Sequence, residues 1–151
     1  MLIKFLASGA FLGYLPQAPG TFGTLWGIPL FYWISRYSPE VQIGIQVLFI
    51  LAAVYLSGRA AQAWGEKDPS RVVVDETVGY LAAVCWLPFT WFTVWGAFFI
   101  FRILDIFKPF PIRKIDRELP GGWGIVLDDV LAGIYSNILL RLIMAASGGF
   151  G

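Results

Sequence analysis

Two pairs of adjacent acidic residues interrupt otherwise apolar parts of the chain. Asp75 and Glu76 precede a charge-free run over 77–101, and Asp128 and Asp129 lie inside a second apolar segment. Acids at a helix N-terminus are favourable through the helix dipole, and this capping role alone could explain the first pair. The second pair is harder to explain as a solvated helix start. Acids that face other acids offer the oxygen ligands that Mg²⁺ takes in proteins, so both pairs are candidate metal ligands.

A third polar group lies at the end of another apolar run. Arg102 and Asp105 are three residues apart, which places them on one face of a helix. That helix should end before Pro109, because a residue that precedes proline is biased out of the helical region. Lys108 lies at this exit. Charge near hydrocarbon requires a partner, so these side chains are candidates for an anion site. The further cations within 113–117 could instead be a plain cytoplasmic anchor.

The segment APGTFGT, residues 18–24, is rich in small residues and contains Thr21 and Thr24. Small residues allow an anion to approach backbone amides, and a helix that begins here would present free amides to phosphate. A turn followed by a helix N-cap is the structural alternative for the same letters.

The absent residue types narrow the chemistry. The chain contains no histidine, which excludes phosphohistidine intermediates, histidine bases and histidine metal ligands. Its one cysteine, Cys85, lies in an apolar run and is expected to be a buried small hydrophobe. A cysteine phosphatase would need an arginine at position 91, which is Trp91. The P-loop and DxDxT patterns are also absent, so catalysis must use carboxylates, Lys, Arg, hydroxyls and a hard cation.

The elements that hold these residues are predicted to be membrane helices. The chain of 151 residues is 58% hydrophobic and 14% charged, whereas soluble domains carry about 25% charge. Charge-free runs cover 5–35, 41–58 and 77–101, and the run 130–151 contains only Arg141. A spanning helix needs about 20 apolar residues, and 41–58 is the clearest candidate.

Loop charge predicts the topology. Prolines and glycines interrupt the first run at 15–24, which leaves a span over about 24–37. Lys and Arg occur on both sides of 77–101, and cytoplasmic loops collect these residues. We therefore expect a helical hairpin that turns near 87–91, with arms short for a full bilayer. The last helix is expected over about 125–146, and no cleaved signal peptide is expected.

These patterns predict one domain over residues 1–151 of all-α class. It is a compact polytopic helical membrane domain of about 4–6 helices, some of them short or only partly immersed. The net charge of +1 gives no basic excess, so no nucleic-acid partner is expected. The oligomeric state stays open.

Four motifs, in the order APGTFGT, VVVDETVGY, FRILDIFKPFPI and LPGGWGIVLDDVLAG, resemble the phosphatidylglycerophosphatase A family from about Leu15 to Asn137. The resemblance implies a Mg²⁺-dependent lipid phosphatase. Its substrate would be phosphatidylglycerophosphate, whose terminal phosphomonoester is hydrolysed to give phosphatidylglycerol and phosphate in phospholipid biosynthesis. The implied location is the bacterial inner (cytoplasmic) membrane, with several membrane passes and an active site that faces the cytoplasm.

The resemblance also marks residues by matched position. The acids of the motifs are marked as catalytic: Asp75, Glu76, Asp105, Asp128 and Asp129. Four of them are marked as ligands of Mg²⁺ or as the acid that activates water: Asp75, Glu76, Asp128 and Asp129. Hydroxyl and cationic side chains are marked for the substrate phosphate: Thr21, Thr24, Arg102 and Lys108. Which carboxylate acts as the base stays open, as does the number of metal ions.

Three alternatives remain at this stage. A small polytopic ion transporter or channel would place the acids at mid-membrane depth along a pore. A non-catalytic membrane scaffold would give no reason for so many acids to meet. Another lipid-phosphate enzyme, such as a transferase, could use the same acidic site.

Overall fold

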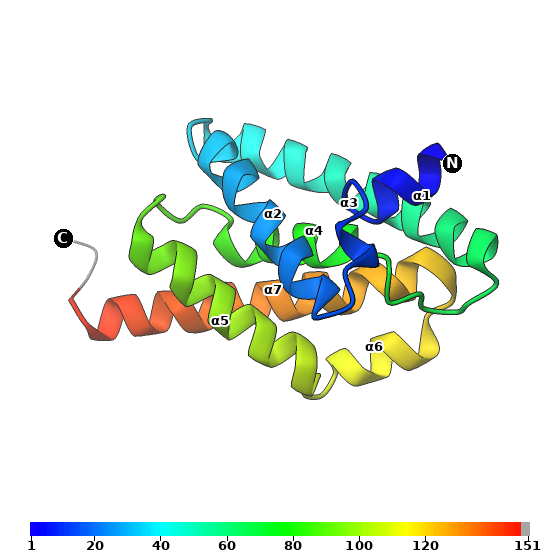
Figure 1. Ribbon diagram of the computed structural model, residues 1–151. Coiled ribbons are helices and arrows are strands. Elements are labelled where there is room, and N and C mark those ends of the chain that lie inside the picture. Colours follow the sequence, from blue (N-terminus) through cyan, green and yellow to red (C-terminus); the bar gives the residue numbers. More distant parts are fainter. Residues whose placement is uncertain (149–151) are drawn as a thin grey trace.

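The computed structural model describes residues 1–148, and within that range the chain is helical and contains no strand. Its elements are α1 (Leu2–Ala7), a 3-10 helix (Leu12–Tyr14), α2 (Pro19–Ile34), α3 (Pro39–Trp64), α4 (Val74–Val84), α5 (Trp91–Phe107), α6 (Ile112–Glu118) and α7 (Gly121–Ala146) (Figure 1). The predicted all-α class is confirmed. About 4–6 helices were expected, and the longer ones are α2, α3, α4, α5 and α7. Two short helices, α1 with 6 residues and α6 with 7 residues, add to them.

Helix α4 is the centre of the structure, in contact with α2, α3, α5 and α7. Every residue from Thr77 to Val84 is buried. Glycines let the neighbouring backbones come this close: a Cβ at Gly133 of α7 would lie 2.1 Å from the carbonyl oxygen of Gly79. Close approach through small residues is the usual way in which helices pack in membranes. The short helix that includes Asp75 and Glu76 in its first turn is therefore fixed tightly by its surroundings.

The expected hairpin is present, with α4 and α5 joined by residues 85–90. Side chains satisfy the carbonyl groups at the end of α4. Asn137 donates to the carbonyls of Ala83 and Cys85, and Arg141 donates to those of Cys85 and Trp86. Cys85 is only partly buried, because it ends the helix instead of packing inside it. Helix α4, with 11 residues, spans about 16 Å, roughly half of the hydrocarbon thickness.

Two helix starts differ from the sequence-based expectation. Helix α2 begins at Pro19, ahead of residue 24, because proline fits the first helical position and the following glycines face α4. Helix α7 begins at Gly121, ahead of residue 125. Helix α3 includes the whole run 41–58 and continues to Trp64.

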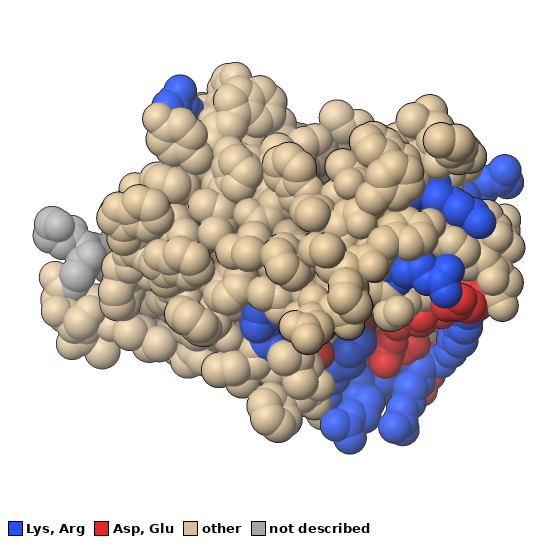
Figure 2. Space-filling model, viewed as in Figure 1, with Lys and Arg blue, Asp and Glu red and all other residues tan. Residues whose placement is uncertain are grey.

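Helices α3 and α7 are long and apolar enough to cross a membrane, and they run antiparallel along the molecule (Figure 1). Only 17% of the most apolar stretch of α3 is buried, unlike the core helix of a soluble protein. Large apolar side chains such as Leu48, Leu51 and Tyr55 are exposed along it. Figure 2 shows charged side chains gathered at one end of the molecule, over α6 and the α3–α4 connection. The described surface thus combines two helices of membrane-spanning length with exposed apolar side chains and a charged end.

Candidate active site

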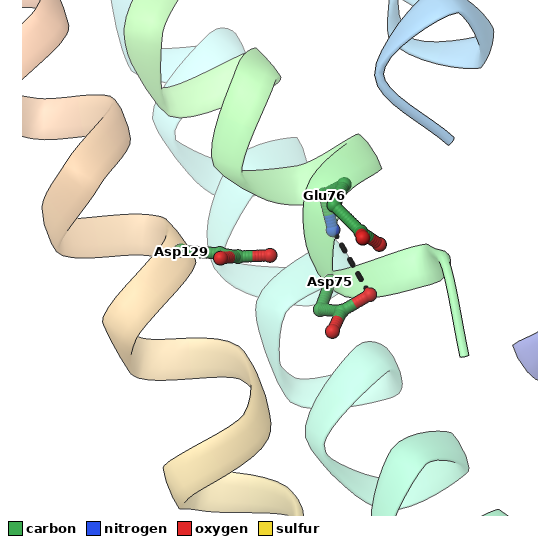
Figure 3. Close-up of side chains that lie close together, drawn as sticks. All are labelled: Asp75, Glu76 and Asp129. Carbon is green, nitrogen blue, oxygen red and sulfur yellow. Dashed lines mark hydrogen bonds between the residues drawn. The ribbon is translucent and has the colours of Figure 1, made fainter. Parts of the chain in front are cut away.

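Three acids from two helices meet inside the protein. Asp75 and Glu76 lie in the first turn of α4, and Asp129 lies on α7. Each offers a carboxylate oxygen, and these oxygens lie within 4.8 Å of one another (Figure 3). The backbone amide of Glu76 donates to a carboxylate oxygen of Asp75 at 3.0 Å. We call Asp75, Glu76 and Asp129 the carboxylate cluster.

The carboxylate cluster concentrates like charge where water is scarce. Asp75 and Asp129 are 7% and 4% exposed, and Oε2 of Glu76 is buried with no hydrogen-bond partner among the described residues. Buried carboxylates at this separation repel one another strongly unless a cation or a proton compensates them. Several oxygen ligands without nitrogen or sulfur suit a hard divalent cation such as Mg²⁺. The residues present therefore fit the expected metal.

Asp128, the neighbour of Asp129, points to a different partner. Its Oδ2 accepts a hydrogen bond from Nζ of Lys108 at 2.5 Å, while Oδ1 is buried and has no partner in residues 1–148. Lys108 also lies 3.5 Å from Asp116. Lys108 ends α5 in the left-handed conformation, with φ of 44°, where its side chain reaches α7. Asp128 thus lies beside the carboxylate cluster and is held in an ion pair.

The charge of Lys108 is secured by these acids. Partial burial disfavours the protonated amine, but the hydrogen bond that Lys108 donates to Asp128 and the attraction of Asp128, Asp129 and Asp116 outweigh burial and raise the pKa of Lys108 above its ordinary value. Lys108 is therefore a fixed positive charge next to the acids, as binding of a phosphate group requires.

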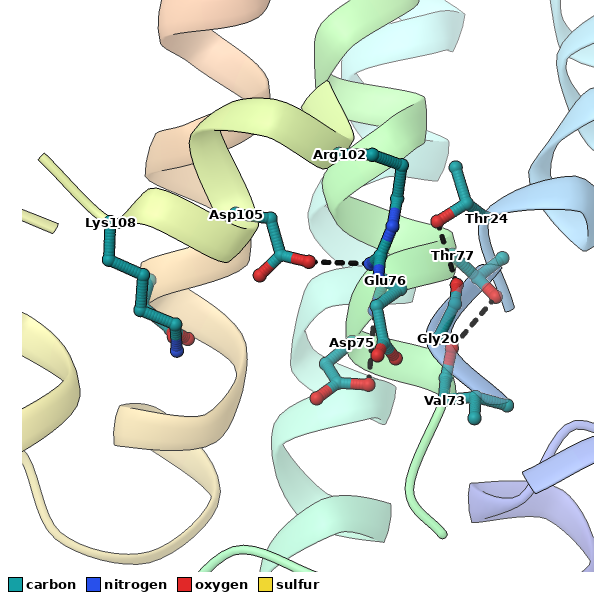
Figure 4. A network of polar contacts seen from close by, with 10 residues as sticks. Gly20, Thr24, Val73, Asp75, Glu76, Thr77, Arg102, Asp105 and Lys108 are labelled. Carbon is teal, nitrogen blue, oxygen red and sulfur yellow. Dashed lines mark hydrogen bonds and ion pairs between the residues drawn. The ribbon is translucent and has the colours of Figure 1, made fainter. Parts of the chain in front are cut away.

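Arg102 and Asp105 supply a second ion pair from α5, with Nη1 and Oδ2 2.5 Å apart (Figure 4). Both side chains are mostly buried. Gly20 of α2 faces the same place: a Cβ at Gly20 would lie 2.2 Å from Oε1 of Glu76 and 3.1 Å from Nη1 of Arg102. The start of α2, the start of α4 and the end of α5 therefore converge at the cluster, and a side chain at position 20 would displace the carboxylate of Glu76.

The two threonines of α2 lie differently. Thr24 is fully buried, and its hydroxyl donates to the carbonyl oxygen of Gly20 at 2.8 Å. Thr21 is half-buried in the first turn, and its amide donates to the carbonyl of Ala18. Thr24 therefore supports the backbone of the segment that faces Glu76 in this structure.

Sequence reasoning missed Asp116, which contacts Lys108 from α6. The sequence favours a basic anchor over 113–117. The presence of Asp116 inside that basic run is the signal by which this contact could have been found. It also missed Thr77, whose hydroxyl donates to the carbonyl of Gly23 at 2.8 Å and joins α4 to α2. A buried threonine one residue after the acid pair gave no pattern from which this bond could be predicted.

Fold and site define a class: an all-helical protein with apolar outer helices and an enclosed carboxylate cluster flanked by Arg and Lys. Comparison with known proteins is more specific. The family model described as phosphatidylglycerophosphatase A matches residues 5–144. The chain therefore belongs to the phosphatidylglycerophosphatase A family. No solved structure matches the chain.

Three curated relatives cover most of the chain. Phosphatidylglycerophosphatase A of Escherichia coli is 39% identical over 91% of this chain and 81% of its own length. That of Haemophilus influenzae is 37% identical, over 91% and 86%. A protein of Bacteroides thetaiotaomicron with the provisional name phosphatidylinositol-3-phosphatase is 39% identical, over 91% and 90%.

Proposed function

We propose that this chain is a Mg²⁺-dependent lipid phosphatase that hydrolyses the terminal phosphomonoester of phosphatidylglycerophosphate, giving phosphatidylglycerol and phosphate for phospholipid biosynthesis. One observation carries the proposal: in a member of this family, three buried carboxylates from α4 and α7 meet beside two cationic side chains from the end of α5. The names of two relatives support the substrate.

The proposed roles follow from position. Asp75, Glu76 and Asp129 would hold Mg²⁺, and Asp128 can join them through its unpaired oxygen or receive the proton of the attacking water. When bound, Mg²⁺ neutralises phosphoryl charge and polarises the phosphorus–oxygen bonds. Arg102 and Lys108 would bind phosphoryl oxygens.

The remaining marked residues support this arrangement. Asp105 positions Arg102 through their ion pair. Thr21, in the first turn of α2, would line the phosphate site, and Thr24 would hold the backbone around Gly20.

The membrane position is part of the proposal. Helices α3 and α7 would cross the inner membrane. The hairpin of α4 and α5 would be only partly immersed beside them. Segments rich in Lys and Arg occur at one end of the molecule, which by the positive-inside tendency would face the cytoplasm (Figure 2). The carboxylate cluster lies toward that end, because Asp75 and Glu76 are in the first turn of α4, next to the α3–α4 connection.

The test pairs turnover with metal-dependent stability. We expect purified protein to release phosphate from phosphatidylglycerophosphate with Mg²⁺, to lose this activity in EDTA, and to regain it when Mg²⁺ is restored. Asp129→Asn should lower turnover by orders of magnitude, because metal stabilisation of the transition state is worth several kcal/mol. It should stay folded while its melting temperature no longer rises with Mg²⁺.

The matched control is Glu40→Gln. Glu40 is an exposed acid in the first turn of α3, at the end of that helix away from the α3–α4 connection. It should keep both turnover and the response to Mg²⁺. Full activity of the wild-type protein after extensive dialysis against EDTA, or a fully active Asp129→Asn, would remove the metal site from the proposal. An unfolded Asp129→Asn would favour a structural role for this acid.

A second candidate substrate, phosphatidylinositol 3-phosphate, is favoured by the provisional name of the Bacteroides thetaiotaomicron relative. The two lipids are offered together to the same purified enzyme, and release of phosphate from each is measured. The preferred substrate is the one with the larger kcat/KM.

A further inference from the structure

The bend between α5 and α6 forms a groove of about 490 Å³, which is linked to the candidate active site through Lys108 and its bond to Asp128. Four cations, two aromatic side chains and one acid line it, together with Pro109: Lys108, Arg113, Lys114, Arg117, Phe107, Phe110 and Glu118. None of the roles proposed so far uses the groove beyond Lys108.

The walls of the groove are held in place by the bend itself. Ile112, the first residue of α6, is fully buried and its amide donates to the carbonyl of Pro109. Arg113 donates to the carbonyl of Phe107 at 3.1 Å, which joins the two sides of the bend. The cations are therefore presented on a fixed scaffold.

The groove has a surplus of positive charge. Lys108 is paired with Asp128, and Lys114 lies 4.0 Å from Glu118. Within residues 1–148, Arg113 and Arg117 form no ion pair. A pair of unmatched guanidinium groups in one groove suits an anion, and the planar donors of arginine match the geometry of phosphate as well as that of carboxylate.

The groove also borders an apolar surface. Phe107 and Phe110 are 69% and 81% exposed, and they continue the exposed face of α5 that includes Ile103 and Ile106. Cations next to exposed aromatic and aliphatic side chains are typical of the membrane–water boundary, where a phospholipid has its own phosphate.

We propose that this groove binds the phosphodiester of the lipid substrate, while the distal phosphomonoester lies at the carboxylate cluster. The inference rests on the proposed function and deepens it. Lys108 joins the two places, because it lines the groove and its Nζ contacts Asp128. The substrate class is then a phospholipid with a phosphodiester between its acylglycerol and its phosphomonoester. Phosphatidylglycerophosphate and phosphatidylinositol 3-phosphate both have this pattern, and phosphatidic acid does not.

The experiment compares substrates that differ in the phosphodiester. Arg113→Gln and Arg117→Gln, singly and combined, are assayed on phosphatidylglycerophosphate and on phosphatidic acid in neutral-detergent micelles, which have no anionic surface. One Lys or Arg beside an anionic lipid contributes about fivefold, so the double variant should lose roughly 25-fold in kcat/KM on phosphatidylglycerophosphate. On phosphatidic acid the loss in kcat/KM should stay below about twofold, because this lipid has no phosphodiester for the two arginines to bind.

A binding measurement separates this inference from the proposed function. Retention of phosphatidylglycerol, which has the phosphodiester alone, is measured by native mass spectrometry for wild type and variants. We expect it to weaken in the double variant and to be unchanged in Arg59→Gln. Arg59 is the matched control, an exposed cation of α3 that lines a different groove.

Each outcome is decisive. Equal losses of kcat/KM on both substrates would show general attraction to anionic lipid and would contradict a phosphodiester site. If the double variant keeps both the wild-type preference between the two lipids and the wild-type retention of phosphatidylglycerol, the groove is not the phosphodiester site, while the phosphatase activity stands. If wild type hydrolyses neither lipid, the proposed function fails, and retention still decides the groove. Arg113→Gln also removes the bond to Phe107, so Arg117→Gln alone serves if that variant unfolds.

Discussion

Replacement of Gly20 by alanine tests whether the start of α2 positions Glu76. The new Cβ would lie 2.2 Å from Oε1 of Glu76, whereas ordinary contact begins at 3.4 Å. The carboxylate must therefore retreat by about 1 Å. A misplacement of about 1 Å at a catalytic group can reduce the rate by about 100-fold, equivalent to roughly 2.7 kcal/mol in the barrier.

The stability of Gly20→Ala should change little. The atom that collides is the end of a flexible side chain, and alanine stabilises a helix by about 0.5–1 kcal/mol relative to glycine. The expected result is a folded protein with about one hundredth of the wild-type kcat/KM for phosphate release.

Two further glycines serve as controls. A Cβ at Gly23 would lie 2.5 Å from the backbone oxygen of Val73, so Gly23→Ala should separate α2 from α4 and destabilise the protein by about 1–3 kcal/mol. Gly44 has no neighbour within 4 Å, and Gly44→Ala should affect neither turnover nor folding adversely. Thermal melts and phosphate release are measured in the same micelles. Wild-type turnover in Gly20→Ala, or a melting temperature as low as that of Gly23→Ala, would refute the reasoning.

Three other variants test neighbouring features. Cys85→Ser should keep most of the turnover, because Cys85 ends α4 away from the carboxylate cluster; a loss as large as that of an acid variant contradicts the metal mechanism. With Cys85→Ala as background, a cysteine at position 70 should escape labelling from outside intact cells, and one at position 38 should be labelled. The reverse labelling pattern would show that the proposed orientation in the membrane is wrong. Arg141→Gln leaves the carbonyl group of Trp86 without its donor and that of Cys85 with Asn137 alone, so it should lower the free energy of unfolding by about 1–3 kcal/mol without abolishing phosphate release. An unchanged melting temperature would show that water replaces the arginine.

Much of the fold could be predicted because it depends on composition. Charge-free runs predicted α3, α7 and the hairpin of α4 and α5. The start of α2 could not be predicted in the same way, because Pro19 and Gly20 suit a turn as well as the first turn of a helix. In the folded chain those glycines pack against α4, and tertiary packing overrides the local preference.

The acids of the site were also visible in the sequence, but their directions were not assigned. Neighbouring side chains on a helix diverge by about 100°, and whether two of them still meet depends on what packs against the helix: Asp75 and Glu76 both reach the carboxylate cluster, whereas Asp128 and Asp129 part. Asp129 reaches the carboxylate cluster, and Asp128 turns to Lys108. The partner on α5, 20 residues away in sequence, depends on the bend after Phe107, which no local pattern specifies.

The division of the carboxylate cluster between α4 and α7 has a consequence for synthesis. A growing chain that has emerged only as far as α6 holds Asp75 and Glu76 but lacks Asp129, so the carboxylate cluster is complete only after α7 has been made. If α7 crosses the bilayer as proposed, it would carry two aspartates, each disfavoured by up to about 3 kcal/mol at a helix centre during insertion. The ion pair of Asp128 with Lys108, which precedes α7 in the chain, would offset part of this cost.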